Sequence, residues 1–138
     1  LNYKDNFQTL SYIESLRVKF FLRDKTLKLF VNDILEKIKE DFFVFLIFGS
    51  SVESKEYKDI DVLFIIQEKD RINEIEKAVS NMASDFSKKF DINVVSVESA
   101  YEMFSKRERI NLLNETLNKH IILFGAENYY RILKNARQ

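Results

Sequence analysis

The chain has 138 residues, of which 46% are hydrophobic and 32% charged, so a single packed domain is expected rather than a disordered chain. Twenty-two basic residues balance 22 acidic ones, which argues against a broad electrostatic surface for nucleic acid. The absence of Cys excludes disulfides and thiolate metal sites, and the single histidine, His120, excludes a metal site built from several histidines of one chain.

Two helices are predicted before the first strand. Ser11 and Glu14 have the spacing of a capping box, and the apolar residues Ile13, Leu16 and Phe20 then follow on one helical face. Asp24 is a predicted cap for the second helix. Its apolar residues recur at intervals of three and four: Leu27, Phe30, Val31, Ile34, Leu35 and Ile38.

Strands and helices alternate in the rest of the chain. The apolar run from Phe42 to Phe48, which ends at Gly49, predicts a buried central strand, and residues 59–66 predict a second one. Further strands are expected over residues 92–97 and 121–124. Helices are expected after Asp70, from Ser99 through Leu117, and over residues 126–136. The predicted class is α/β or α+β, a single domain with a small sheet.

The candidate functional residues lie mainly in the segment from Leu46 to Phe64. A buried strand leads into the turn Gly49-Ser50-Ser51, and Asp59 and Asp61 open the next strand. Residues two apart on a strand point to the same side, so the two carboxylates repel each other unless a cation lies between them. Magnesium with a bound triphosphate is a natural occupant, because Mg²⁺ takes a few carboxylates together with phosphate oxygens and water. The glycine allows close backbone approach, and amides at the start of a following helix can hold phosphate.

This arrangement resembles the DNA polymerase β-like nucleotidyltransferase superfamily, and within it the minimal nucleotidyltransferases. The family pattern is matched by Phe48-Gly49-Ser50 and by Asp59-Ile60-Asp61-Val62-Leu63, and the segment from His120 to Tyr130 is similar to the closing segment of small members. The resemblance implies a nucleotidyltransferase fold, with a small mixed sheet flanked by helices, over residues 24–138. Residues 1–23 resemble the helical connector that follows an upstream domain in some relatives.

The resemblance also assigns roles to individual residues. Gly49, Ser50 and Ser51 are expected to bind the nucleotide, and Asp59 and Asp61 to hold Mg²⁺ as catalytic carboxylates. The family's third carboxylate lies on a following strand, where Asp91 is the nearest match. Asp91 is therefore expected either to complete the catalytic and metal-binding set or to be a turn residue at the edge of that strand.

The implied activity is Mg²⁺-dependent transfer of a nucleoside monophosphate, AMP from ATP or its equivalent from another nucleoside triphosphate, to an acceptor hydroxyl. Because minimal members are often paired with a helical protein of the HEPN type in toxin–antitoxin modules, such a protein is the expected acceptor. Nucleic acid is expected to bind only through a domain upstream of Leu1. Two alternatives stay open: a catalytically inactive binding module or antitoxin with this fold, and part of a DNA-binding regulator.

No membrane attachment is expected. No apolar run approaches the roughly 18–20 residues that span a bilayer, and no signal peptide is visible. The expected location is the cytoplasm.

Overall fold

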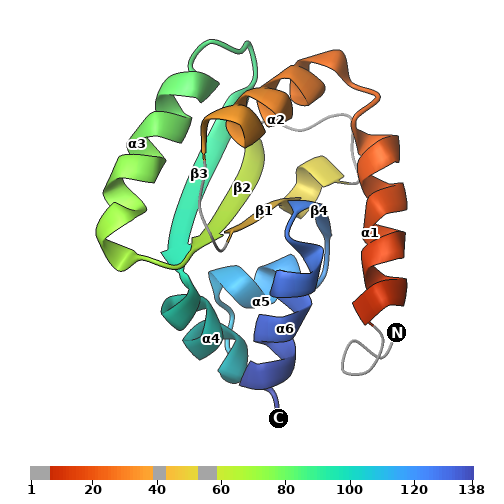
Figure 1. Cartoon of the computed structure of the whole chain (residues 1–138), viewed down its shortest axis with the longest axis vertical. Helices are drawn as coiled ribbons and strands as arrows, with labels where there is room; N and C mark the ends of the chain where they lie inside the picture. The colour runs from red at the N-terminus through yellow and green to blue at the C-terminus, as the bar shows by residue number, and fades with distance from the viewer. Residues whose placement is uncertain (1–6, 39–42, 53–58) are drawn as a thin grey trace.

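The computed structural model describes residues 7–38, 43–52 and 59–138, and it confirms a mixed sheet flanked by helices (Figure 1). The first half holds α1 (Phe7–Phe21), α2 (Lys25–Lys37), β1 (Phe43–Phe48), the 3-10 helix η1 (Gly49–Val52) and β2 (Asp59–Ile66). The second half holds the 3-10 helix η2 (Lys69–Arg71), α3 (Ile72–Ala83), β3 (Lys89–Ser96), α4 (Val97–Ser105), α5 (Leu112–Thr116), β4 (His120–Phe124) and α6 (Ala126–Ala136).

The strands of the described residues form one sheet in the order β3-β2-β1-β4. Strand β1 is antiparallel to both of its neighbours, whereas β2 and β3 are parallel. The end of β1 therefore lies at the same edge of the sheet as the starts of β2, β3 and β4. This edge, called the site edge below, brings together Gly49, Asp59, Asp91 and His120.

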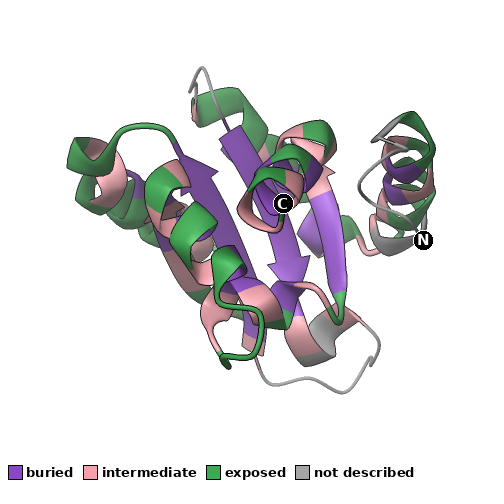
Figure 2. Ribbon diagram, turned by 90° about the horizontal axis from the view of Figure 1, so that it is seen from below, coloured by how far each residue is buried: buried purple, intermediate pink, exposed green. Residues whose placement is uncertain are grey.

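Helices cover both faces of the sheet. One face packs against α2 and α3, and the other packs against α1, α4, α5 and α6 (Figure 1, Figure 2). All six residues of β1 are buried, because side chains of alternating residues enter the two cores in turn. The prediction of a buried central strand over this run is confirmed.

The predicted cap of α2 is confirmed, whereas the predicted helix starts at Ser11 and Asp70 are wrong. The Asp24 carboxylate accepts hydrogen bonds from the backbone N–H groups of Thr26 and Leu27, at 2.9 and 3.2 Å, and so caps α2 as expected. Ser11 lies inside α1, which begins at Phe7, so the capping box predicted there is wrong. Asp70 lies within η2 and does not cap α3.

The predicted long helix from Ser99 to Leu117 is also wrong, because it is divided into α4 and α5. Ser96 and Asn111 cap these two helices through their side chains. Asn114 donates hydrogen bonds to the carbonyls of Lys106 and Arg109 in the connection, at 2.9 and 2.8 Å. Asparagine side chains thus bind backbone groups that a continuous helix would have paired internally.

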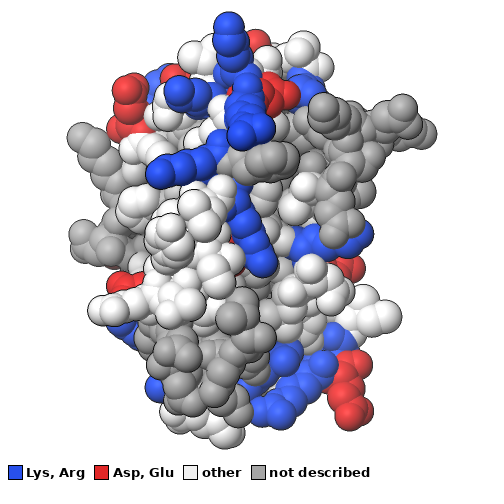
Figure 3. Space-filling view, turned by 90° about the vertical axis from the view of Figure 1, so that its right-hand side faces the viewer, with Lys and Arg blue, Asp and Glu red and all other residues white. Residues whose placement is uncertain are grey.

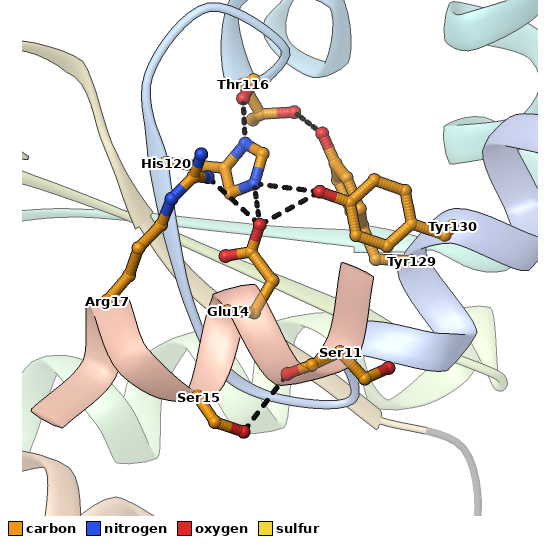
Figure 4. A network of polar contacts seen from close by, with 8 residues as sticks. All are labelled: Ser11, Glu14, Ser15, Arg17, Thr116, His120, Tyr129 and Tyr130. Carbon is orange, nitrogen blue, oxygen red and sulfur yellow. Dashed lines mark hydrogen bonds and ion pairs between the residues drawn. The ribbon is translucent and has the colours of Figure 1, made fainter. Parts of the chain in front are cut away.

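A buried polar network attaches α1 to β4 and α6 (Figure 4). Glu14 Oε1 lies 2.9 Å from His120 Nε2, and it accepts a hydrogen bond of 2.9 Å from the Tyr130 hydroxyl. His120 Nδ1 lies 2.7 Å from the Thr116 carbonyl oxygen. Burial raises the pKa of Glu14, but the hydrogen bonds and charge of His120, with Tyr130 and Arg17, outweigh it and leave the pKa below its ordinary value.

Candidate functional site

Three aspartates lie near the site edge on one face of the sheet. Asp59 and Asp61 are two residues apart in β2, so their side chains share the face that carries Leu63 and Ile65 farther along the strand. Asp91 of β3 is in register with Asp61 of the parallel β2. Residues paired in this way lie side by side and point to the same face, so Asp91 joins Asp59 and Asp61.

Asp91 lies inside β3, and its interpretation as a turn residue is wrong. The strand was predicted over residues 92–97, but pairing with β2 begins at Lys89. The earlier start of the strand depends on a contact with a distant residue, because the Phe90 ring stacks on Phe30 with a centroid separation of 4.1 Å. Asn93 shares the face of Asp91 and donates from Nδ2 to the Val62 carbonyl at 3.3 Å.

Gly49 brings the β1 turn into contact with the carboxylates. Its φ of +81° lies in the left-handed region that favours glycine. A Cβ added to Gly49 would lie 2.5 Å from Asp61 Oδ2, so the missing side chain leaves room for that oxygen. In the sheet, Asp61 is the partner of Phe48, the residue before Gly49. The Gly-Ser turn and the carboxylates are therefore neighbours, as the motif predicted.

The surroundings of Asp61 disfavour a negative charge. Partial burial raises the pKa of Asp61, and the charges of Asp91 and Asp59, a side-chain hydrogen bond with Asp91 and the charge of Glu115 raise it further. Lys89 Nζ lies 3.9 Å from Asp59 Oδ1, but the Lys89 side chain is 78% exposed and that of Asp59 is 44% exposed, so this ion pair contributes little. A bound cation at this face would relieve the repulsion.

The donor set fits Mg²⁺ by its chemistry, since the ion prefers carboxylate oxygens and the charges of Asp59 and Asp91 already disfavour the ionised form of Asp61. Within residues 7–38, 43–52 and 59–138, however, no three or more His, Cys, Asp or Glu side chains are gathered closely enough to hold a metal ion. The side chains of Asp59, Asp61 and Asp91 would therefore have to turn toward one another to share an ion.

Three more residues belong to the candidate site or act on it: Ser50, Ser51 and Glu115. Ser50 and Ser51 lie in η1, and their side chains are outside the described part of the chain. Glu115 of α5 was not predicted, although its charge acts on Asp61. No motif marks Glu115, which lies in α5, the short helix that follows α4. The spacer at residues 53–58 lies outside the described residues.

Comparison with known proteins provides no relative from which a function could be transferred. No family model, curated protein or solved structure matches this chain. The resemblance to the nucleotidyltransferases therefore depends on the residues quoted above and stays a prediction. In the part of the chain that the structure describes, no helix combines the length and apolar character needed to cross a membrane.

Gly49→Ala tests the contact between the turn and Asp61. We expect the free energy of unfolding to fall by about 1–2 kcal/mol, because alanine is strained in the left-handed region. The added methyl group also displaces the Asp61 carboxylate, so binding of Mg-ATP, the ligand expected from the sequence motif, should weaken. Urea denaturation and calorimetry measure the two effects.

Gly49→Asn separates strain from steric conflict, because asparagine tolerates a positive φ better than alanine does. It should recover part of the stability while binding stays weakened. Wild-type stability and wild-type binding in Gly49→Ala would contradict the described geometry.

Proposed function

We propose that this chain is a Mg²⁺-dependent nucleotidyltransferase that transfers AMP from ATP to a hydroxyl group of an acceptor. The observation that supports the proposal is the register of Asp61 with Asp91, which places both on the face of the sheet that Asp59 shares, with Asp61 beside Gly49. Carboxylates next to a glycine turn are the donor set that a metal-bound triphosphate requires.

The glycine-serine turn and the three carboxylates have separate roles in the proposal. The backbone of Gly49 and Ser50 would hold the β- and γ-phosphates. Asp59, Asp61 and Asp91 would hold Mg²⁺, which when bound supplies positive charge that stabilises phosphoryl transfer and the leaving pyrophosphate. The protein contributes by positioning these groups, without a covalent intermediate.

The reaction is an in-line displacement at the α-phosphorus. The acceptor oxygen forms a bond to that phosphorus, the bond to the oxygen bridging the α- and β-phosphorus atoms breaks, and pyrophosphate leaves. The acceptor proton passes to the Asp91 carboxylate, which is exposed and so can be reached by an acceptor from solvent. Asn93 beside it can offer a hydrogen bond but cannot take the proton.

A protein acceptor is proposed in preference to RNA. The chain has no net charge, which does not favour a polyanionic acceptor. Following the resemblance, the proposed acceptor is a helical protein of the HEPN type, and the proposed reaction places AMP on one of its hydroxyl groups.

Ligand-dependent stabilisation tests the proposal directly. Mg²⁺ with ATP should raise the melting temperature, and ATP with EDTA should raise it much less, because the repulsion among Asp59, Asp61 and Asp91 would then remain. Ligand at about 100 times its dissociation constant should stabilise the fold by roughly 2.7 kcal/mol. Calorimetry that detects no heat with millimolar Mg-ATP would refute the proposal.

A second candidate function is a binding module with this fold that has lost the chemistry. In this alternative Asp59, Asp61 and Asp91, which do not form a metal-binding group as they stand in the described residues, would not come together on an ion. Such a module would bind nucleotide or a partner but would release no pyrophosphate from ATP, whereas the proposed enzyme releases pyrophosphate when its acceptor is present.

A further inference from the structure

A pocket of about 460 Å³ opens on the opposite side of the β1 end from the carboxylates. Leu16 and Arg17 of α1, Val52 of η1, and Asn118 and Lys119 before β4 line it. In the sheet, Phe48 has Asp61 as its partner on one side and His120, which also borders the pocket, on the other. The pocket and the carboxylates therefore flank the same strand end.

The pocket combines an apolar wall with two cations. Leu16 is 49% exposed although it is a large apolar residue, and half-buried Val52 lines the same space. Arg17 and Lys119 provide the positive charge, and both side chains are exposed. An apolar surface next to cations suits a ligand with a flat apolar part and an anionic part.

Arg17 is held in place by the buried network. Its Nη1 lies 3.0 Å from Glu14 Oε1, and Glu14 is in turn bound by His120 and Tyr130 (Figure 4). A guanidinium group has five N–H donors, and the contact with Glu14 involves only Nη1. Because 46% of the Arg17 side chain is exposed, the group is both oriented and accessible.

Charge complementarity identifies the ligand class. A nucleoside triphosphate carries more negative charge than one bound Mg²⁺ neutralises, and Asp59, Asp61 and Asp91 add further negative charge. Its phosphates therefore need cations that approach from the other side of Gly49. On the face of the molecule that carries α1, Lys and Arg side chains run from the top to about the middle, and others lie separately at the lower edge (Figure 3).

We infer that this pocket binds the nucleoside triphosphate, with Arg17 and Lys119 contacting the phosphates and the base lying against Leu16 and Val52. The inference rests on the proposed function and adds to it the residues that select the substrate. It also gives α1 a part in the site, since Arg17 and Leu16 both belong to that helix.

Titration calorimetry of the full chain in EDTA, with inorganic tripolyphosphate as the first probe, tests the cations without metal. Lys119→Met and Arg17→Met should each weaken binding by about tenfold, as expected for loss of a charge-assisted contact. Lys19→Met is the matched control, because Lys19 is exposed on α1 and does not line this pocket, and it should bind within about twofold of wild type. If Arg17→Met does not fold because its contact with Glu14 is lost, Lys119→Met still tests the inference, because Lys119 is exposed.

ATP is the second probe and tests the apolar wall. Leu16→Ser should weaken ATP binding by about fivefold while tripolyphosphate binding stays unchanged, since only the base meets Leu16. Leu29→Ser is the control, because Leu29 is equally apolar and exposed on α2, away from the pocket.

The outcomes separate this inference from the proposed function. No tripolyphosphate binding by wild type, or unchanged binding in Lys119→Met, would overturn the inference even if the chain released pyrophosphate from Mg-ATP. Tripolyphosphate binding that depends on Lys119, in a chain that never releases pyrophosphate, would support the pocket and overturn only the enzymatic proposal.

Discussion

Asp61→Asn is expected to abolish transfer of AMP while making the protein without ligand more stable at neutral pH. Asparagine is nearly isosteric with aspartate, so the pairing of β2 with β1 and β3 should persist. The substitution removes the carboxylate closest to Gly49, and thus a charge that the proposed Mg²⁺ site requires. In wild type the same charge is repelled by Asp91 and Asp59. Its removal should therefore raise the free energy of unfolding.

The stability difference should depend on pH in a defined direction. The folded-state pKa of Asp61 is raised above its ordinary value of 3.8, so the folded chain binds a proton more tightly than the unfolded chain does. Wild-type stability therefore decreases as the pH rises from about 3.8 through the raised pKa. The stability of Asp61→Asn does not decrease in this way, because asparagine has no proton to lose in this pH range. Its advantage should be about 1 kcal/mol or less at pH 7, because the group is partly exposed, and should vanish near pH 3.

Two measurements check this prediction. Thermal or urea denaturation at pH 3 and pH 7 gives the stability difference. Transfer is followed with α-labelled ATP, Mg²⁺ and a HEPN-type acceptor, together with release of pyrophosphate. Undiminished transfer in Asp61→Asn would show that this carboxylate does not hold the metal. A variant less stable than wild type at pH 7 would contradict the repulsion at the site edge.

Asp91→Asn is expected to separate binding from catalysis. Asp91 is the most exposed of the three carboxylates, and in the proposed function it takes the proton of the acceptor. Because Asp59 and Asp61 remain, Mg-ATP binding should stay within about tenfold of wild type, or roughly 1.4 kcal/mol. Transfer should fall at least about a hundredfold, since the proposed base is lost.

Asp70→Asn provides the control for this second variant. Asp70 is also exposed, but it lies in η2, after the end of β2 that is remote from the site edge. It should match wild type in both binding and transfer. Normal turnover in Asp91→Asn would mean that another group takes the proton, and binding without transfer in wild type would favour the inactive binding module.

Local sequence signals predict the elements that form the site edge. The apolar run of β1 is long enough for a strand and is buried on both faces, and Asp24 caps α2 through its own side chain. The bounds of β2 are confirmed at Asp59 and Ile66. With a period of two residues, these bounds already put Asp59 and Asp61 on one side of the strand.

Contacts between distant segments decide where sequence reasoning is wrong. On α1 the periodicity favoured Leu16 as a buried residue, yet Leu16 is 49% exposed and Glu14 is 2% exposed. The pattern of apolar residues cannot show that a carboxylate will be buried. Glu14 is buried because His120 and Tyr130, more than a hundred residues away, supply its hydrogen bonds.

By itself, therefore, the sequence determined the central strand, the Gly49 turn and the shared face of Asp59 and Asp61, since each depends on neighbours a few residues apart. Only the tertiary structure decided that Asp91 lies inside β3, because stacking of Phe90 on Phe30 extends that strand. It also decided that Glu115 and the pocket at Arg17 adjoin the site. Those arrangements depend on how α5 and α1 pack against the sheet, and no local pattern encodes that packing.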